Sequence, residues 1–81
     1  MPNLVLYKMD TCPYCQKVMR YVASEFPHPD AIAYRDITTD AGARDELVRV
    51  GGKAQVPCLF VDGSPMYESD DIVAYLKTLA D

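Results

Sequence analysis

Cys12 and Cys15, separated by two residues in the stretch TCPYC, are the residues of this 81-residue chain best suited to chemistry. Cysteines at this spacing can bind a metal ion, form a structural disulfide or exchange electrons with other thiols. A zinc site needs about two further ligands, and the chain offers only Cys58, in an apolar stretch, and His28, between prolines. A structural bridge would close a loop too short to constrain the unfolded chain. Redox exchange is therefore the predicted chemistry, and no metal ligand is assigned.

A helix predicted over 13–26 gives the two thiols unequal surroundings. Cys12 would lie at its N-cap, where unpaired N–H groups and the positive end of the helix dipole stabilise a thiolate. Cys15 would lie one turn later, partly covered, where it can attack a mixed disulfide on Cys12. The carboxylate of Asp10 would lie close to Cys12 and oppose formation of its thiolate.

Strands and helices that alternate along the chain predict an α/β fold. Apolar runs predict strands over 3–8, 31–37, 57–61 and 64–67, and apolar periodicity predicts helices over 13–26, from Thr39 or Asp40 to about Val50, and from Ser69 onward. We expect Leu47 and Val50 to face inward and Gly51-Gly52 to end the second helix.

The connections predict the arrangement of these elements. The first βαβ unit should cross over right-handed, with parallel strands, and Asp62-Gly63 should join the last two strands as a hairpin. Pro65 lacks an N–H group, so its strand is expected at the sheet edge. The prediction is a single domain over 1–81, in the order β-α-β-α-β-β-α, with a four-stranded mixed sheet and three helices.

The composition restricts the partners. Eight Lys and Arg stand against twelve Asp and Glu, a net charge of −4 without a basic cluster, which disfavours nucleic-acid binding. The apolar runs are far shorter than the roughly 20 residues that span a bilayer, and the N-terminus has no signal-peptide pattern. Three cysteines do not suit a secreted disulfide framework. We therefore expect a cytoplasmic protein with no membrane partner.

Three motifs, TCPYC, VPCLF and the later ESDDI, resemble the glutaredoxin family in order and spacing. The resemblance covers nearly the whole chain. It implies a thioredoxin-like fold, a cis bond between Val56 and Pro57, and glutathione as co-substrate with no tightly bound cofactor. Cys12 matches the nucleophile and Cys15 the resolving cysteine. The implied activity is the reduction of disulfide-containing and glutathionylated proteins, and we expect a monomer.

The resemblance also implies a glutathione groove. The expected contacts are Tyr14, Gln55, Val56, Pro57, Ser69 and Asp70. Ser69, at a helix N-terminus, would offer N–H groups to the γ-glutamyl carboxylate, and Asp70 an anion to its ammonium. Gln55 stands where the family usually has threonine, and its amide can still serve as a contact.

Two departures from the family pattern concern charge. Met9 stands where the family commonly has a lysine for the glycyl carboxylate of glutathione, and Lys8, one residue earlier, points to the other face of a strand. Which of Lys8, Arg44, Arg49 and Lys53 replaces this lysine stays open. Tyr67-Glu68 replaces the usual Gly-Gly, and the stretch YESDDI looks like the N-terminal domain of glutathione transferases, which binds the same γ-glutamyl group.

Two other functions stay open. A redoxin reduced by thioredoxin reductase is disfavoured because Ser69 and Asp70 are retained. A carrier of an iron–sulfur cluster between two subunits, ligated by Cys12 and glutathione, is disfavoured because Pro13 stiffens the loop. Cys58 is expected to be a small buried apolar residue, with a regulatory thiol as the alternative.

Overall fold

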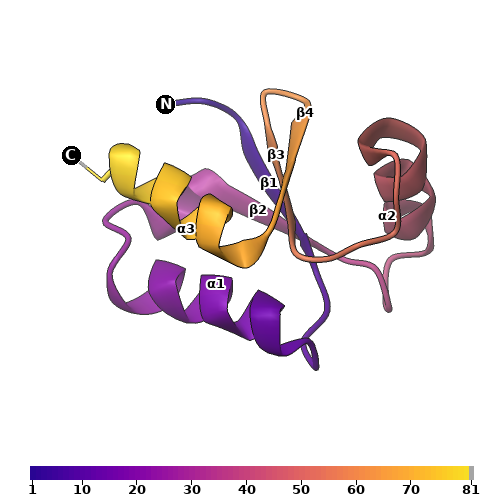
Figure 1. The fold of residues 1–81 in the computed structure, drawn as a ribbon, viewed down its shortest axis with the longest axis horizontal. Coiled ribbons are helices and arrows are strands. Elements are labelled where there is room, and N and C mark those ends of the chain that lie inside the picture. Colours follow the sequence, from indigo (N-terminus) through magenta and orange to yellow (C-terminus); the bar gives the residue numbers. More distant parts are fainter. Residues whose placement is uncertain (81) are drawn as a thin grey trace.

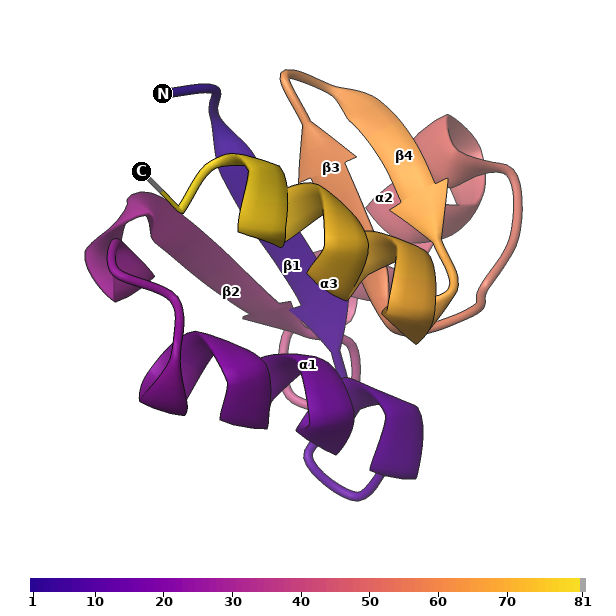
Figure 2. The same ribbon diagram turned by 60° about the vertical axis from the view of Figure 1, so that its left-hand side comes forward.

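The computed structural model describes residues 1–80 and has a four-stranded mixed sheet flanked by three α-helices (Figures 1 and 2). The strands are β1 (Leu4–Lys8), β2 (Ile32–Asp36), β3 (Cys58–Val61) and β4 (Ser64–Tyr67). The helices are α1 (Pro13–Ser24), α2 (Ala41–Glu46) and α3 (Ser69–Thr78). A 3-10 turn over Pro29–Ala31 precedes β2, and α2 continues as a wider π-helical turn over Leu47–Gly51. The predicted element order and the thioredoxin-like architecture are confirmed.

The sheet has the strand order β2-β1-β3-β4. The parallel pair β1 and β2 sets Lys8 opposite Asp36, and β3 runs antiparallel to β1 with Cys58 opposite Tyr7. The hairpin turn at Asp62 and Gly63 has positive φ angles of 49° and 86°, as a tight primed turn requires. β4, which contains Pro65, lies at the edge as predicted.

Helices cover both faces of the sheet because side chains along a strand alternate between its faces. Figure 2 shows α1 and α3 together in front of the sheet, and Figure 1 shows α2 on its other side. The first core comprises Leu4, Leu6, Val18, Tyr21, Val22, Phe26, Ile32, Leu59, Ile72 and Leu76. The second core comprises Tyr7, Ala43, Leu47, Cys58 and Phe60. Within residues 1–80, no helix is long and apolar enough to cross a membrane.

The end of the second helix differs in one respect from the prediction. Asp40 caps α2 as expected, since its carboxylate accepts from the Gly42 N–H at 3.1 Å. Leu47 is fully buried, but Val50 is 42% exposed, so its predicted inward position is wrong. The π-helical turn carries an extra residue per turn, which rotates Val50 away from the face that Leu47 occupies. Gly52 ends the turn with a φ of 94°.

Candidate active site

Cys12 lies where β1 gives way to α1, at the N-cap of the helix. Its Sγ accepts a hydrogen bond from the Cys15 N–H at 3.4 Å, and its carbonyl accepts one from the Gln16 N–H at 2.9 Å. Pro13 occupies the first helical position, where a missing N–H group costs nothing. The thiol is partly exposed, and its Sγ lies 4.0 Å from the Val56 carbonyl oxygen. The Cys12 sulfur is therefore reachable from solvent and lies at the N-terminus of α1.

Cys15 is fully buried one turn further along α1. Burial raises the pKa of its thiol to about 12, against the opposing effect of a hydrogen bond that the Met9 N–H donates to the sulfur at 3.5 Å. At neutral pH the Cys15 thiol therefore keeps its proton. The two cysteines differ in exposure as the sequence predicted, one reachable from solvent and one shielded.

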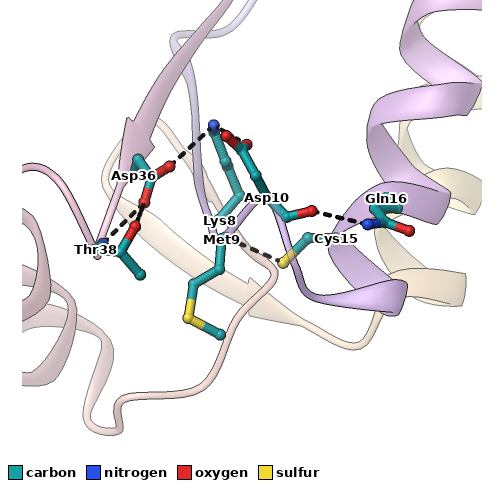
Figure 3. A network of polar contacts seen from close by, with 7 residues as sticks. All are labelled: Lys8, Met9, Asp10, Cys15, Gln16, Asp36 and Thr38. Carbon is teal, nitrogen blue, oxygen red and sulfur yellow. Dashed lines mark hydrogen bonds and ion pairs between the residues drawn. The ribbon is translucent and has the colours of Figure 1, made fainter.

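A network of polar side chains ties the segment before Cys12 to the sheet (Figure 3). The Lys8 ammonium lies 2.5 Å from an oxygen of Asp10 and 3.3 Å from an oxygen of Asp36, and the Lys8 side chain is only 14% exposed. The Gln16 amide donates to the Asp10 carbonyl at 2.8 Å. Asp10 was expected to oppose the Cys12 thiolate, but Lys8 pairs with its carboxylate. The sequence did not reveal that Lys8 also pairs with Asp36, because Asp36 comes from another strand.

The pKa values of two groups in this network are shifted. The hydrogen bond to Asp10 raises the pKa of Lys8 above its usual value, with a smaller contribution from Asp36. The pKa of Asp36 is lowered, chiefly because the Thr38 hydroxyl and N–H both donate to its carboxylate, at 2.5 and 2.8 Å. Both groups therefore stay charged around neutral pH.

A groove with a volume of about 580 Å³ opens beside Cys12. Its lining consists of Tyr14, Gln55, Val56, Pro57, Glu68, Ser69, Asp70 and Asp71. The structure thus brings together all six residues that the resemblance suggested as glutathione contacts. The bond between Val56 and Pro57 is cis, as the resemblance implied. Glu68 and Asp71 were missed as groove residues, although the acidic run around Ser69 was a signal for them.

The N-terminus of α3 forms one side of this groove. Ser69, its first residue, is 7% exposed, and Glu68 before it has a φ of 71°. Across the groove, the Gln55 amide donates to the Glu68 carboxylate at 3.3 Å. Asp70 forms an exposed ion pair with Lys17 of α1. The groove therefore lies between α1, the segment before β3 and the start of α3.

The cations proposed to replace the missing lysine do not line the groove. Lys8 belongs to the network with Asp36, and the Lys53 ammonium lies over the Tyr67 ring, 4.5 Å from its centroid. Arg44 and Arg49 lie on the exposed surface of the second helical segment.

Cys58 is fully buried in the second core, as expected of a small apolar residue. Burial raises the pKa of its thiol. Among residues 1–80, no group of three His, Cys, Asp or Glu side chains is arranged to hold a metal ion.

Comparisons with known proteins concern the family and the fold of the chain. A family model described as Glutaredoxin matches residues 4–66. Glutaredoxin 3 of Escherichia coli K12 is 28% identical over 76 residues, which cover 91% of this chain and 86% of the relative. A thioredoxin-like protein solved by crystallography matches with a TM-score of 0.72 at 23% identity, covering 90% of this chain and 97% of that one. Glutaredoxin 2 from Salmonella typhimurium, solved in complex with glutathione, matches with a TM-score of 0.71 at 28% identity, covering 98% of this chain and 34% of that one.

Proposed function

Because the chain belongs to the glutaredoxin family, we propose that it catalyses glutathione-dependent reduction of protein disulfides and of mixed disulfides between proteins and glutathione. Membership of the family supports a glutathione-linked thiol redox role in general. One observation carries the specific activity: a partly exposed Cys12 lies at a helix N-terminus beside the groove formed by the expected glutathione contacts.

In the proposed reaction with a glutathionylated protein, the Cys12 thiolate attacks the glutathione sulfur. The protein thiolate leaves and takes up a proton, and Cys12 carries glutathione. The thiolate of a second glutathione attacks the glutathione sulfur on Cys12, so that oxidised glutathione forms and the Cys12 thiolate is released. The N-terminus of α1 stabilises this leaving thiolate in the second step.

With a protein disulfide, Cys15 supplies the second sulfur. Cys12 forms a mixed disulfide with the substrate, and the Cys15 thiol loses its proton and attacks the Cys12 sulfur. The bond from Cys12 to the substrate breaks as the Cys12–Cys15 disulfide forms, and two glutathione molecules reopen it. A buried, protonated Cys15 does not compete with Cys12 for the first attack.

We propose that glutathione lies along the groove with its cysteinyl backbone against Val56 and its γ-glutamyl end at α3. The N–H groups at the start of α3 suit the γ-glutamyl carboxylate. The γ-glutamyl ammonium would take the place of Lys17 beside Asp70. This exchange costs little because exposed ion pairs contribute only about 0–1 kcal/mol.

A coupled turnover assay tests the proposal. Wild-type protein should reduce a glutathionylated protein in the presence of glutathione, glutathione reductase and NADPH, and Cys12→Ser should abolish the reaction. Cys15→Ser should keep this reaction and lose reduction of protein disulfides. Wild-type turnover no faster than that of Cys12→Ser would refute the proposed function.

Two further measurements address the other functions. Turnover with thioredoxin reductase and NADPH, but none with glutathione, would favour a thioredoxin-reductase-coupled redoxin. A brown dimer obtained by purification without oxygen would favour an iron–sulfur carrier.

A further inference from the structure

A second hollow, with a volume of about 390 Å³, lies between α1 and α3, which Figure 2 shows together in front of the sheet. We call it the basic hollow, because its lining holds three cationic residues and only one anionic residue. The chain as a whole has a net charge of −4, so this local excess of two positive charges opposes the overall balance. The lining includes Lys17, Arg20, Lys77, Glu25, Tyr21 and Val73.

The fold creates this cluster of cations, since the sequence itself has no basic run. Lys17 and Arg20 lie three residues apart and therefore share one face of α1. Lys77 joins them from the last turn of α3. Tyr21 belongs to the first core and Val73 packs against it, so these two side chains supply an apolar part of the lining.

Two of the three cations can receive a carboxylate from outside. Arg20 and Lys77 are exposed, and within residues 1–80 neither forms an ion pair, although Glu25 lines the same hollow. The Lys77 ammonium lies 6.0 Å from the centroid of the Tyr21 ring. A contact with one ring leaves N–H groups of the ammonium open to other acceptors.

The third cation joins the hollow to the groove beside Cys12. Lys17 pairs with Asp70, and Asp70 lines that groove. When the γ-glutamyl ammonium takes the place of Lys17 beside Asp70, the Lys17 ammonium becomes free to pair with another carboxylate. Binding of glutathione in the groove therefore favours an acidic group in the hollow.

The hollow lies within reach of a peptide whose cysteine is at the active site. A helical rise of about 1.5 Å per residue places Lys17 and Arg20 roughly 8 and 12 Å beyond Cys12 along α1. An extended chain, at about 3.3 Å per residue, covers these distances in about two to four residues.

We propose that the basic hollow docks an acidic segment of the protein substrate, with its carboxylates about two to four residues from the glutathionylated cysteine. This inference rests on the proposed function, and the sulfur exchange is the one described there. A protein segment suits the hollow better than a small anion does, because an acidic side chain also brings methylene groups to Tyr21 and Val73. The glutathione of the same substrate lies in the groove that Lys17 and Asp70 connect to the hollow.

The overall charge predicts the opposite preference. The net charge of −4 and the carboxylates of Glu68, Asp70 and Asp71 in the groove lining repel an acidic substrate. A preference for acidic substrates would therefore report a local contact, and the sign of the charge effect decides between the two.

Glutathionylated peptides that differ only in charge test the proposal. Each carries one modified cysteine, with two acidic, two neutral or two basic residues placed two to four positions away on each side. Turnover with glutathione, glutathione reductase and NADPH gives kcat/KM for each peptide. Each value is divided by the rate of the same peptide with a small neutral thiol, which corrects for the reactivity of its disulfide.

The corrected kcat/KM of the acidic peptide should exceed that of the neutral peptide about three- to tenfold at about 0.02 M salt, as a few exposed charge pairs allow. The basic peptide should be the slowest. The differences should shrink at about 0.5 M salt, because salt screens exposed charges. Equal values at both salt concentrations, or a slower acidic peptide, would overturn the inference.

Matched variants locate the effect in the hollow. Arg20→Gln should lower kcat/KM for the acidic peptide about two- to threefold and leave the neutral peptide unchanged, and Lys77→Gln should do the same from the other helix. Arg44→Gln removes the same charge from an exposed position on α2, on the other side of the sheet (Figure 1), and should leave both peptides unchanged. An Arg44→Gln effect equal to that of Arg20→Gln would overturn the assignment to the hollow.

Binding without chemistry distinguishes the other occupants. The acidic peptide with serine in place of its cysteine should shift the amide resonances of Arg20, Tyr21 and Lys77. Shifts caused by inorganic phosphate but not by this peptide would indicate a small-anion site. Shifts that grow with protein concentration alone would indicate contact between copies of this chain. Either result would overturn the inference.

The outcomes also separate the inference from the proposed function. Turnover of all three peptides without a preference for the acidic one refutes the inference alone. Failure to turn over any of them refutes the proposed function, and the inference with it.

Discussion

The buried thiol of Cys15 predicts a pH signature for the reduction of protein disulfides. Burial raises its pKa to about 12, so only a very small fraction of Cys15 is a thiolate at pH 7. That fraction rises about tenfold per pH unit until the pH approaches the pKa. A free cysteine, with a pKa near 8.5, would level off above about pH 9.

A symmetric chromogenic disulfide makes the closure of the Cys12–Cys15 bond visible in a stopped-flow experiment. One coloured thiolate is released when Cys12 attacks, and the second when Cys15 closes the ring. The rate constant of the second phase should increase about a hundredfold from pH 7 to pH 9 without levelling off. Cys15→Ser should show only the first phase. A second phase that reaches a plateau by about pH 9 would refute the reasoning, since Cys15 would then titrate like an exposed thiol.

The same shift has a consequence for stability. The folded protein holds the Cys15 proton more tightly than the unfolded chain does. The contribution of the Cys15 thiol to the free energy of unfolding is therefore fully present below about pH 8.5. It is lost as the pH rises towards the pKa of Cys15 in the folded protein. Urea unfolding of Cys15→Ala should show a smaller loss of stability than wild type between pH 8 and about pH 10. An equal loss in the two proteins would contradict the assigned pKa.

Three further predictions concern the fold. Gly51→Ala should destabilise the protein by about 1–3 kcal/mol in urea unfolding, because a Cβ there would lie 2.5 Å from the Tyr67 hydroxyl oxygen; a Tyr67→Phe background should reduce this cost. Leu47→Ala should lower the free energy of unfolding by about 2–5 kcal/mol, because Leu47 is fully buried. Val50→Lys, at an exposed position, should change it by less than about 0.5 kcal/mol. Equal effects of the two substitutions would contradict the observed burial. The pKa of Asp36 is lowered in the folded protein. Its contribution to the free energy of unfolding is therefore present above about pH 3.9 and is lost as the pH falls through this lowered pKa. Asp36→Asn should therefore flatten the acid limb of the stability profile, and an unchanged limb would contradict this.

Local chemistry made much of the fold predictable. The Asp62-Gly63 turn, the cap at Asp40 and the edge position of Pro65 each follow from backbone requirements that few residues meet. Val50 was mispredicted because it falls in a π-helical turn, whose extra residue breaks the helical period on which the prediction depended.

The site was predictable to a lesser extent. The unequal exposure of Cys12 and Cys15 follows from their spacing at a helix start. The pairing of Lys8 with Asp36 depends on the parallel register between two strands, which no local pattern specifies. The acidic run around Ser69 was visible in the sequence, but that Glu68 and Asp71 line the groove follows only from the placement of α3 beside Gln55.

The two halves of the site come together only when β3 pairs with β1 and completes the sheet. The dithiol belongs to the first βαβ unit, whereas the groove residues from Gln55 to Asp71 surround the β-hairpin and the start of α3. A chain that has folded only its N-terminal unit would carry both cysteines without a groove beside them. Glutathione-linked turnover would therefore report on the whole folded chain, whereas the reactivity of Cys12 and Cys15 alone would report only on the first βαβ unit.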